Sequence, residues 1–186
     1  MVKASKSSVP TVVVRTRRAY FDCKFGQLHV RTAFPTTGGF DEQVTLFCLH
    51  PSNASSRVFS RFLAELADVR SVYAPDLPGH GESDPSPSRS VAEAAMAVTD
   101  LAKELRLRQI DLLGFQYGAE VALTVAAAQP ELVRRLVLAG ISSSERLSTV
   151  KQPRLMMDVS NYGEQPFDAA PQVLAQQVNT FLRGHS

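Results

Sequence analysis

The sequence predicts an α/β fold in which a mostly parallel, twisted sheet is covered by helices on both faces, as a three-layer sandwich. Between residues 44 and 141, short apolar segments alternate with segments of helical periodicity. This alternation is typical of right-handed crossovers between parallel strands. The chain has 186 residues, of which 44% are hydrophobic and 20% charged. That size and composition fit a single domain over 1–186, with residues 1–10 expected as a flexible N-terminus.

The N-terminal part predicts an antiparallel hairpin at an edge of the sheet. Thr11 to Phe21 is rich in Val, Arg and Tyr, and Leu28 to Phe34 is a second segment of the same kind. The turn between them is expected at Phe25 to Gln27. Pro35 to Gly39 is expected as a loop because of its Pro and Gly content.

A buried strand and a helix come next. Val44 to Leu49 is a continuous apolar run, which is typical of a strand buried on both faces of a parallel sheet. In the polar loop that follows, Ser55 and Ser56 are suited to cap a helix. The apolar residues of that helix recur at helical spacing: Val58, Phe59, Phe62, Leu63 and Leu66.

A second strand and helix are joined by a long loop. Ser71 to Pro75 predicts a short strand that leads into Asp76 to Asp84, a segment rich in Gly and Pro. Pro85 to Ser90 extends this loop. Val91 to Leu105 then has the periodicity of an amphipathic helix.

The feature that dominates the sequence is a strand, a tight turn and a helix. Ile110 to Leu113 is apolar, and Ala119 to Ala128 consists almost entirely of helix formers. Gly114 to Gly118 has a Gly at each end, which lets the backbone reverse sharply and present Gln116 at the tip. In the G-x-S-x-G motif this position carries a nucleophilic serine. A primary amide is neither acidic nor nucleophilic at neutral pH, so Gln116 cannot replace that serine.

The C-terminal third is less regular. Leu136 to Ile141 predicts a strand, Ser142 to Val150 a short helix, and Leu155 to Met157 a last short strand. A terminal amphipathic helix is expected over 173–182, with one face formed by Val173, Leu174, Val178 and Leu182.

The charge distribution argues against a nucleic-acid partner. The formal net charge is +2 with both signs interspersed, whereas a groove-binding protein gathers more basic residues on one face. We expect the two basic clusters to lie on solvated faces; they are Arg15, Arg17 and Arg18, and the pair Arg134 and Arg135.

No stretch reaches the ~18 apolar residues of a membrane span, and the first ten residues lack the apolar core of a signal peptide. We therefore expect a cytoplasmic protein without a membrane partner. In a reducing compartment Cys23 and Cys48 are expected as free thiols. The four histidines are not at a metal-ligand spacing, so neither a metal nor a cofactor is expected.

Three motifs, in this order, resemble the α/β-hydrolase superfamily: a strand ending in Leu49-His50, the Asp76 to Asp84 loop and the Gly114 to Gly118 turn. The tail is similar to the end of such proteins, with Gly163 to Pro171 followed by a helix that closes in Phe181-Leu182. The resemblance implies a shortened member without a lid.

The resemblance also implies that the catalytic triad is degenerate. Gln116 occupies the nucleophile position, and Glu164 occupies the position of the histidine base. Only 22 residues, 142 to 163, separate the last family-like strand from the tail, which leaves no room for the loop that carries the acid. Asp158 is the one carboxylate near that place, and we expect it to end the final strand.

The oxyanion region differs as well. Members of this superfamily usually show His-Gly before the amides that hold the developing negative charge, whereas here the pair is His50-Pro51, and proline has no N–H. The amides of Ser52 and Tyr117 remain candidates for this role.

Three functions are compatible with these residues. The one we favour is an α/β-hydrolase-fold protein that has lost the serine mechanism and binds a small apolar ligand or a protein partner. The alternative is a working hydrolase or lyase that uses non-standard residues around the turn, namely Gln116, His50 and His80. A purely structural module is the third. We expect both histidines to make loop hydrogen bonds instead of doing chemistry.

The shortened tail predicts an unusual sheet edge. Either the strand at 155–157 moves in beside Leu136 to Leu138, or that edge stays open. An open edge of unpaired N–H and C=O groups invites pairing with another chain, and the missing lid would leave the pocket mouth around Tyr117 uncovered, so we expect self-association into a homo-oligomer or a bound partner.

Overall fold

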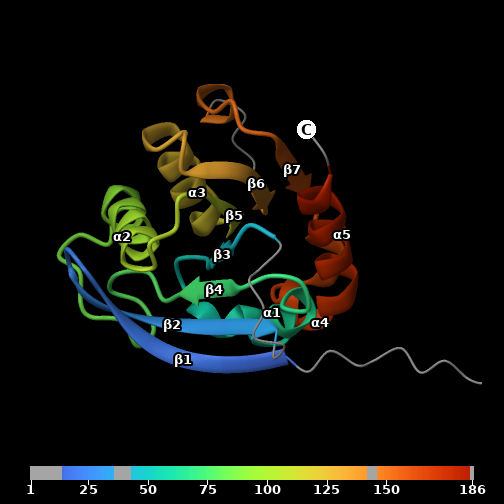
Figure 1. Ribbon diagram of the computed structural model, residues 1–186, viewed down its shortest axis with the longest axis horizontal. Helices are drawn as coiled ribbons and strands as arrows, with labels where there is room; N and C mark the ends of the chain where they lie inside the picture. Colours follow the sequence, from blue (N-terminus) through green and yellow to red (C-terminus); the bar gives the residue numbers. More distant parts are fainter. Residues whose placement is uncertain (1–13, 36–42, 142–145, 185–186) are drawn as a thin grey trace, which may run out of the picture.

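A seven-stranded sheet lies between two layers of helices in the computed structural model, which describes residues 14–35, 43–141 and 146–184 (Figure 1). The strand order is β1-β2-β4-β3-β5-β6-β7. The strands are β1 (Val14–Cys23), β2 (Gly26–Pro35), β3 (Leu46–Leu49), β4 (Val72–Pro75), β5 (Ile110–Phe115), β6 (Val133–Ala139) and β7 (Arg154–Met157). β2 runs antiparallel to β1 and β4, and the remaining neighbours are parallel.

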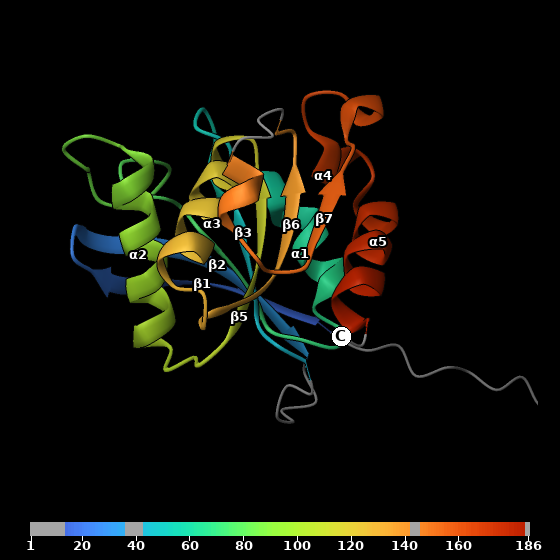
Figure 2. The same cartoon turned by 90° about the horizontal axis from the view of Figure 1, so that it is seen from above.

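The helices lie on both faces of the sheet, as predicted (Figure 2). α2 and α3 cover one face, and α1, α4 and α5 cover the other. The helices are α1 (Ser60–Leu66), α2 (Val91–Glu104), α3 (Tyr117–Ala128), α4 (Pro166–Ala169) and α5 (Pro171–Arg183), with short 3₁₀ turns η1 (Ser56–Phe59), η2 (Arg146–Thr149) and η3 (Ser160–Tyr162). None of the helices in the described ranges is long and apolar enough to cross a membrane.

The N-terminal hairpin is confirmed at the edge of the sheet. β1 and β2 pair over their full length, and the turn lies at Lys24 and Phe25, one residue earlier than expected. The predicted N-terminus 1–10, loop residues 36–39 and residues 142–145 of the predicted short helix lie outside the described residues.

Each helical layer has its own apolar core. Leu112 and Leu136 pack under α2 and α3, whereas Leu113 and Val137, their neighbours along β5 and β6, pack under α1 and α5. Side chains alternate between the faces of a strand, so strands buried on both faces need the continuous apolar runs seen in this sequence.

Two predictions about side-chain exposure were wrong. Val173 is 48% exposed, because the buried face of α5 is formed by Leu174, Val178 and Leu182 and does not include Val173. The pair Arg134 and Arg135 does not lie on a solvated face.

Arg135 is 5% exposed and donates to the carbonyl oxygens of Phe181 and Leu182 at 3.0 and 2.8 Å and to that of Gly184. Arg134 binds the buried Asp111 through two hydrogen bonds, of 2.9 and 2.6 Å. Cations favour the carboxyl end of a helix, where its last carbonyls lack intrahelical partners. This arginine pair therefore anchors the end of α5 to β6.

The last strand takes the first of the two positions considered above. β7 pairs in parallel with β6, with Met156 beside Leu138. Asp158 follows β7 directly, as expected, and accepts the N–H of Ser160 at 2.9 Å.

Candidate functional site

The turn between β5 and α3 is a strained elbow. Gln116 has φ 51° and ψ −112°, a conformation that L residues rarely adopt. Its N–H donates to the carbonyl oxygen of Ala139 at 2.8 Å, which ties the tip to β6. Strain of this kind costs about 1–3 kcal/mol and persists only where the surroundings impose it.

Two glycines beside Gln116 let the strand and the helix pack closely enough to hold this strained conformation. A Cβ on Gly118 would lie 2.0 Å from the carbonyl oxygen of Leu49, and a Cβ on Gly114 would lie 2.3 Å from that of Gly118. Both contacts are with backbone, which cannot move aside. The helix and the strand thus approach each other as closely as glycine permits, and Gln116 is left exposed at the carboxyl edge of the sheet.

His50 is fully buried beside this elbow and has both ring nitrogens engaged. Its Nδ1 contacts the carbonyl oxygen of Pro51 at 2.8 Å, and Nε2 accepts the N–H of Leu77 at 2.9 Å. Nδ1 must therefore carry the proton. Burial lowers the pKa of His50 to about 4, so the ring is neutral at pH 7. His50 joins two loops, and it has no nitrogen left to take a proton from a substrate.

His80 lies next to it on the Asp76 to Asp84 loop. Its Nδ1 is 3.0 Å from the carbonyl oxygen of Pro78, and its ring lies 5.2 Å from that of His50 and 6.0 Å from that of Tyr117. The Tyr117 hydroxyl donates to the carbonyl oxygen of Arg89 at 3.1 Å. The structure therefore brings Gln116, Tyr117, His50 and His80 to one edge, as predicted.

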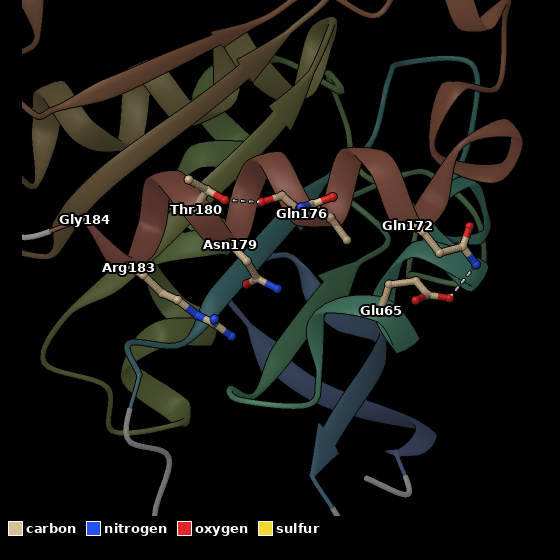
Figure 3. A pocket seen from close by; sticks show the side chains of 8 residues that line it. Glu65, Gln172, Gln176, Asn179, Thr180, Arg183 and Gly184 are labelled. Carbon is tan, nitrogen blue, oxygen red and sulfur yellow. Dashed lines mark hydrogen bonds between the residues drawn. The ribbon is translucent and has the colours of Figure 1, made fainter. Parts of the chain in front are cut away.

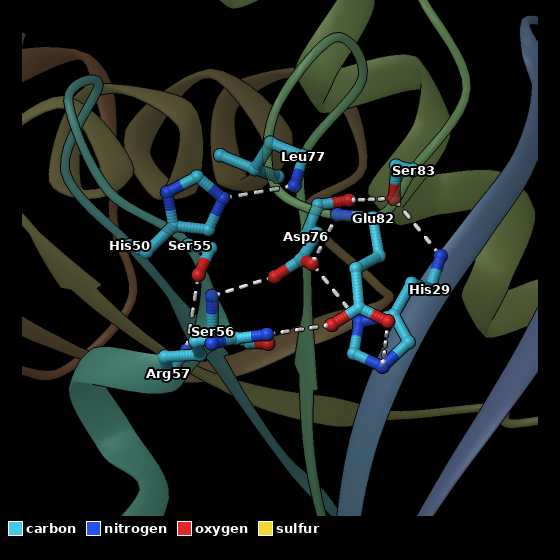
Figure 4. Close-up of polar contacts among 9 residues, drawn as sticks. All are labelled: His29, His50, Ser55, Ser56, Arg57, Asp76, Leu77, Glu82 and Ser83. Carbon is cyan, nitrogen blue, oxygen red and sulfur yellow. Dashed lines mark hydrogen bonds and ion pairs between the residues drawn. The ribbon is translucent and has the colours of Figure 1, made fainter.

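The carboxylate of Asp76 holds the Asp76 to Asp84 loop in place through hydrogen bonds (Figure 4). Its carboxylate accepts the N–H of Ser56 at 2.6 Å, the N–H of Glu82 at 2.8 Å and the Nδ1 proton of His29 at 2.9 Å. Burial raises the pKa of this carboxyl, but these hydrogen bonds outweigh burial and hold its pKa below the usual range. Asp76 is thus a structural anion that fixes the loop carrying His80.

Sequence reasoning missed His29 as part of this network. It is 1% exposed on β2, between the core residues Leu28 and Val30. The available signal was a histidine flanked by two apolar residues in a strand, and a histidine buried there requires a partner.

A recess of about 450 Å³ opens at the elbow tip. Its walls are largely apolar and come from the ends of β5, β6 and β7, including Phe115, Leu138, Ile141, Met156 and Val159. Gln116, Asp158 and Ser160 are its polar groups. A mostly apolar cavity of this size with a few convergent polar groups is typical of a small-molecule site.

A second cavity, of about 610 Å³, is unrelated to the elbow (Figure 3). It lies between α1 and α5, where Gln172 Nε2 donates to the Glu65 carboxylate at 2.9 Å. None of its described lining residues borders the recess over Gln116.

Comparison with known proteins agrees with this geometry. A family model described as the alpha/beta hydrolase fold matches residues 44–186. The chain belongs to the α/β-hydrolase fold family.

Individual members of the family cover parts of the chain. An uncharacterized protein of Mycobacterium tuberculosis is 33% identical over 130 residues, 69% of this chain and 34% of that protein. A 2-hydroxymuconate semialdehyde hydrolase of Pseudomonas sp. is 42% identical over 83 residues, 42% of this chain and 28% of that protein. A crystal structure of an N-acyl homoserine lactonase is 26% identical with a TM-score of 0.59, over 67% of this chain and 45% of that one. The chain spans between about a quarter and a half of the length of these relatives.

Two further positions singled out from the α/β-hydrolase resemblance are not assembled with the elbow. Ser52 is exposed on the loop after β3 and does not line the recess. Glu164 is exposed after η3; its neighbour Gly163 lines the recess, but Glu164 itself does not. Of the proposed capping serines, Ser55 accepts the N–H of Arg57, whereas Ser56 donates its own N–H to Asp76.

Proposed function

We propose that this α/β-hydrolase-fold chain does not use a serine-histidine-acid mechanism and binds a small, largely apolar ligand in the recess over Gln116. One observation carries the proposal: the elbow keeps its strained backbone although its tip holds an amide. A glycine at that position would relieve the strain, so the retained conformation supports a role for the Gln116 side chain.

The Gln116 amide offers both a donor and an acceptor to a ligand. Met156 and Leu138 supply apolar contact beside it. We therefore expect the ligand to be an apolar molecule with one carbonyl or hydroxyl group, held in an orientation that the amide fixes.

The same geometry supports the absence of this chemistry. A hydrolase of this type needs a nucleophile with a base within hydrogen-bond reach. Gln116 supplies no nucleophile, both nitrogens of His50 are engaged, and Glu164 does not line the recess.

The alternative, a working hydrolase or lyase, depends on His80. This half-buried ring lies close to Tyr117, and no hydrogen bond of its Nε2 to a described residue is present. A hydrolase of that kind would turn over 4-nitrophenyl butyrate and lose the activity in His80→Gln or Gln116→Ala.

Binding to the recess can be tested with the dye 1-anilinonaphthalene-8-sulfonate. We expect the protein to enhance its fluorescence, Met156→Trp to fill the recess and abolish this, and Val173→Trp to leave it unchanged. Val173 is the matched control because it is about as exposed as Met156, at 48% against 45%, but lies on α5. Equal enhancement in both variants would reject the recess as the binding site.

A further inference from the structure

A basic recess lies at the N-terminal hairpin and shares none of its described lining residues with the recess over Gln116. It measures about 580 Å³ and is formed where β1 and β2 face η1 and α1. Its polar lining includes the side chains of Thr16, Arg18, Arg31, Arg57 and Ser60. None of the described residues that line it is acidic.

Two of these arginines form a direct cross-strand pair. Arg18 on β1 is the register partner of Arg31 on β2, so both side chains leave the same face of the hairpin. Like charges directly opposite each other destabilise an antiparallel pair. No ion pair of either arginine with a described carboxylate relieves this repulsion.

Arg31 is the less exposed of the two. Its Nε is buried and has no hydrogen-bond partner among the described residues. A buried N–H donor without an acceptor is costly, and most such donors in proteins are paired. An acceptor supplied by a ligand would satisfy the Nε donor and relieve the cross-strand repulsion together.

Arg57 adds a third positive charge, which is already compensated. Its guanidinium donates to Glu82 at 3.1 Å, and this hydrogen bond, with a smaller contribution from the charge of Arg18, holds the pKa of Glu82 below its usual range (Figure 4). Glu82 does not line the recess. Arg18 is near enough to Glu82 to lower its pKa but forms no ion pair with it, and Arg31 forms no ion pair with a described carboxylate, so neither charge at the centre of the recess is directly paired.

We propose that this recess binds a phosphate-type oxyanion, either free or as the phosphate group of a larger molecule. Arg18 and Arg31 contribute planar guanidinium donors, which match phosphate oxygens in geometry and charge. The hydroxyls of Thr16 and Ser60 border the same space and complete a polar wall. The site is separate from the ligand recess over Gln116 and does not depend on the function proposed for it.

The test is titration of the protein with sodium phosphate in an isothermal calorimeter at low ionic strength. We expect saturable binding that Arg31→Gln and Arg18→Gln each weaken by at least about tenfold, since each removes charge-assisted hydrogen bonds. Arg15→Gln is the matched control. Arg15 lies on β1 with the same charge and an exposed side chain, but its register partner is Phe34 and it points to the opposite face.

A second readout does not need the ligand. In the absence of phosphate, Arg18→Gln should raise the midpoint of thermal unfolding, because it removes the repulsion with Arg31. A lowered midpoint, or phosphate binding that Arg15→Gln weakens as much as Arg18→Gln, would overturn the proposal. So would the lack of saturable binding in the wild-type protein.

Vesicles distinguish the source of the phosphate group. If it belongs to a lipid, the protein will sediment with vesicles of phosphatidylcholine and phosphatidic acid but not with phosphatidylcholine alone, and Arg31→Gln will abolish this. If the ligand is a free phosphate compound, calorimetric binding persists and no vesicle binding occurs. Sedimentation that is insensitive to Arg31→Gln would reject this recess as the lipid contact.

Discussion

The backbone N–H of Leu77 donates a hydrogen bond to Nε2 of the fully buried His50 over 2.9 Å. Protonation of His50 must break this bond, because an imidazolium has no acceptor. The pKa of His50 is lowered from 6.5 to about 4, so the unfolded chain binds a proton that the folded chain rejects between those values. The free energy of unfolding that neutral His50 contributes is fully present above pH 6.5 and is lost as the pH falls towards 4.

We expect acidification from pH 7 to pH 4 to remove up to about 3 kcal/mol through His50 alone. Urea unfolding at several pH values measures the loss. A His50→Asn variant should be less stable at pH 7 and should show a flatter dependence between pH 6.5 and 4. An unchanged slope in that variant would assign the acid sensitivity to other groups.

Restoring serine at the elbow should not restore a hydrolase. Gln116→Ser supplies a hydroxyl, but His50 is engaged on both nitrogens and Glu164 lies outside the recess. Without a base the hydroxyl stays protonated and unreactive. We expect no turnover of 4-nitrophenyl acetate above the blank and no labelling by a fluorophosphonate probe. Labelling of the introduced hydroxyl in that variant would show that another residue acts as the base.

Relieving the elbow strain should stabilise the protein at the expense of binding. In Gln116→Gly the φ of 51° is no longer unfavourable, and we expect a gain of about 1 kcal/mol in the free energy of unfolding. Gln116→Ala removes the same side chain but keeps the strain, so it should bring no such gain. Denaturant unfolding of the three proteins compares these values. Equal stabilities would mean that the strain is not stored at this residue.

The close approach of α3 to β3 should make Gly118 intolerant of any side chain. A Cβ there would lie 2.0 Å from the carbonyl oxygen of Leu49, so Gly118→Ala must displace the helix, and we expect a loss of at least about 2 kcal/mol. Gly184→Ala is the control, since its nearest contact would be 3.3 Å away. Thermal unfolding of both variants tests this, and a Gly118→Ala protein as stable as wild type would contradict the packing described.

The outer edge of β7 should mediate self-association. The N–H of Leu136 on β6 donates to the carbonyl oxygen of Pro153. Backbone groups alternate in direction along a strand, so the N–H of Leu155 points towards β6 and the N–H of Met156 points away from it. We expect dimers at micromolar concentration by light scattering. Met156→Pro removes the outward N–H and should give monomers, whereas Met156→Thr keeps that donor and should not. A monomeric wild-type protein would refute the prediction.

Most of the fold could be predicted because its signals are local. The apolar run at Val44 to Leu49 and the turn at Gly114 to Gly118 each determine their own structure, since a doubly buried strand and a tight reversal need those residue types. The position of Gln116 at the sheet edge follows from the same patterns.

The errors at the arginine pair and at His29 concern pairings between distant residues. Arg134 and Arg135 resemble a solvated pair in sequence, and only their contact with the end of α5 and with Asp111, 23 residues from Arg134, shows that they are structural. The link from His29 to Asp76 spans 47 residues. Such pairings carry no periodicity, so a local pattern could at most mark His29 as a polar residue between two apolar ones and could not indicate its partner.

The arginine anchor of α5 has a consequence for synthesis of the chain. Arg135 is a buried residue of β6, yet the carbonyl oxygens that accept its hydrogen bonds come more than forty positions later in the chain, at Phe181 and Leu182. Until those residues leave the ribosome, Arg135 lacks these acceptors and Arg134 has Asp111 but not the carbonyl oxygen of Leu182, and the face of the sheet that α5 covers stays exposed to solvent. A nascent chain should therefore remain sensitive to proteases until α5 emerges, and then become more resistant in a single step.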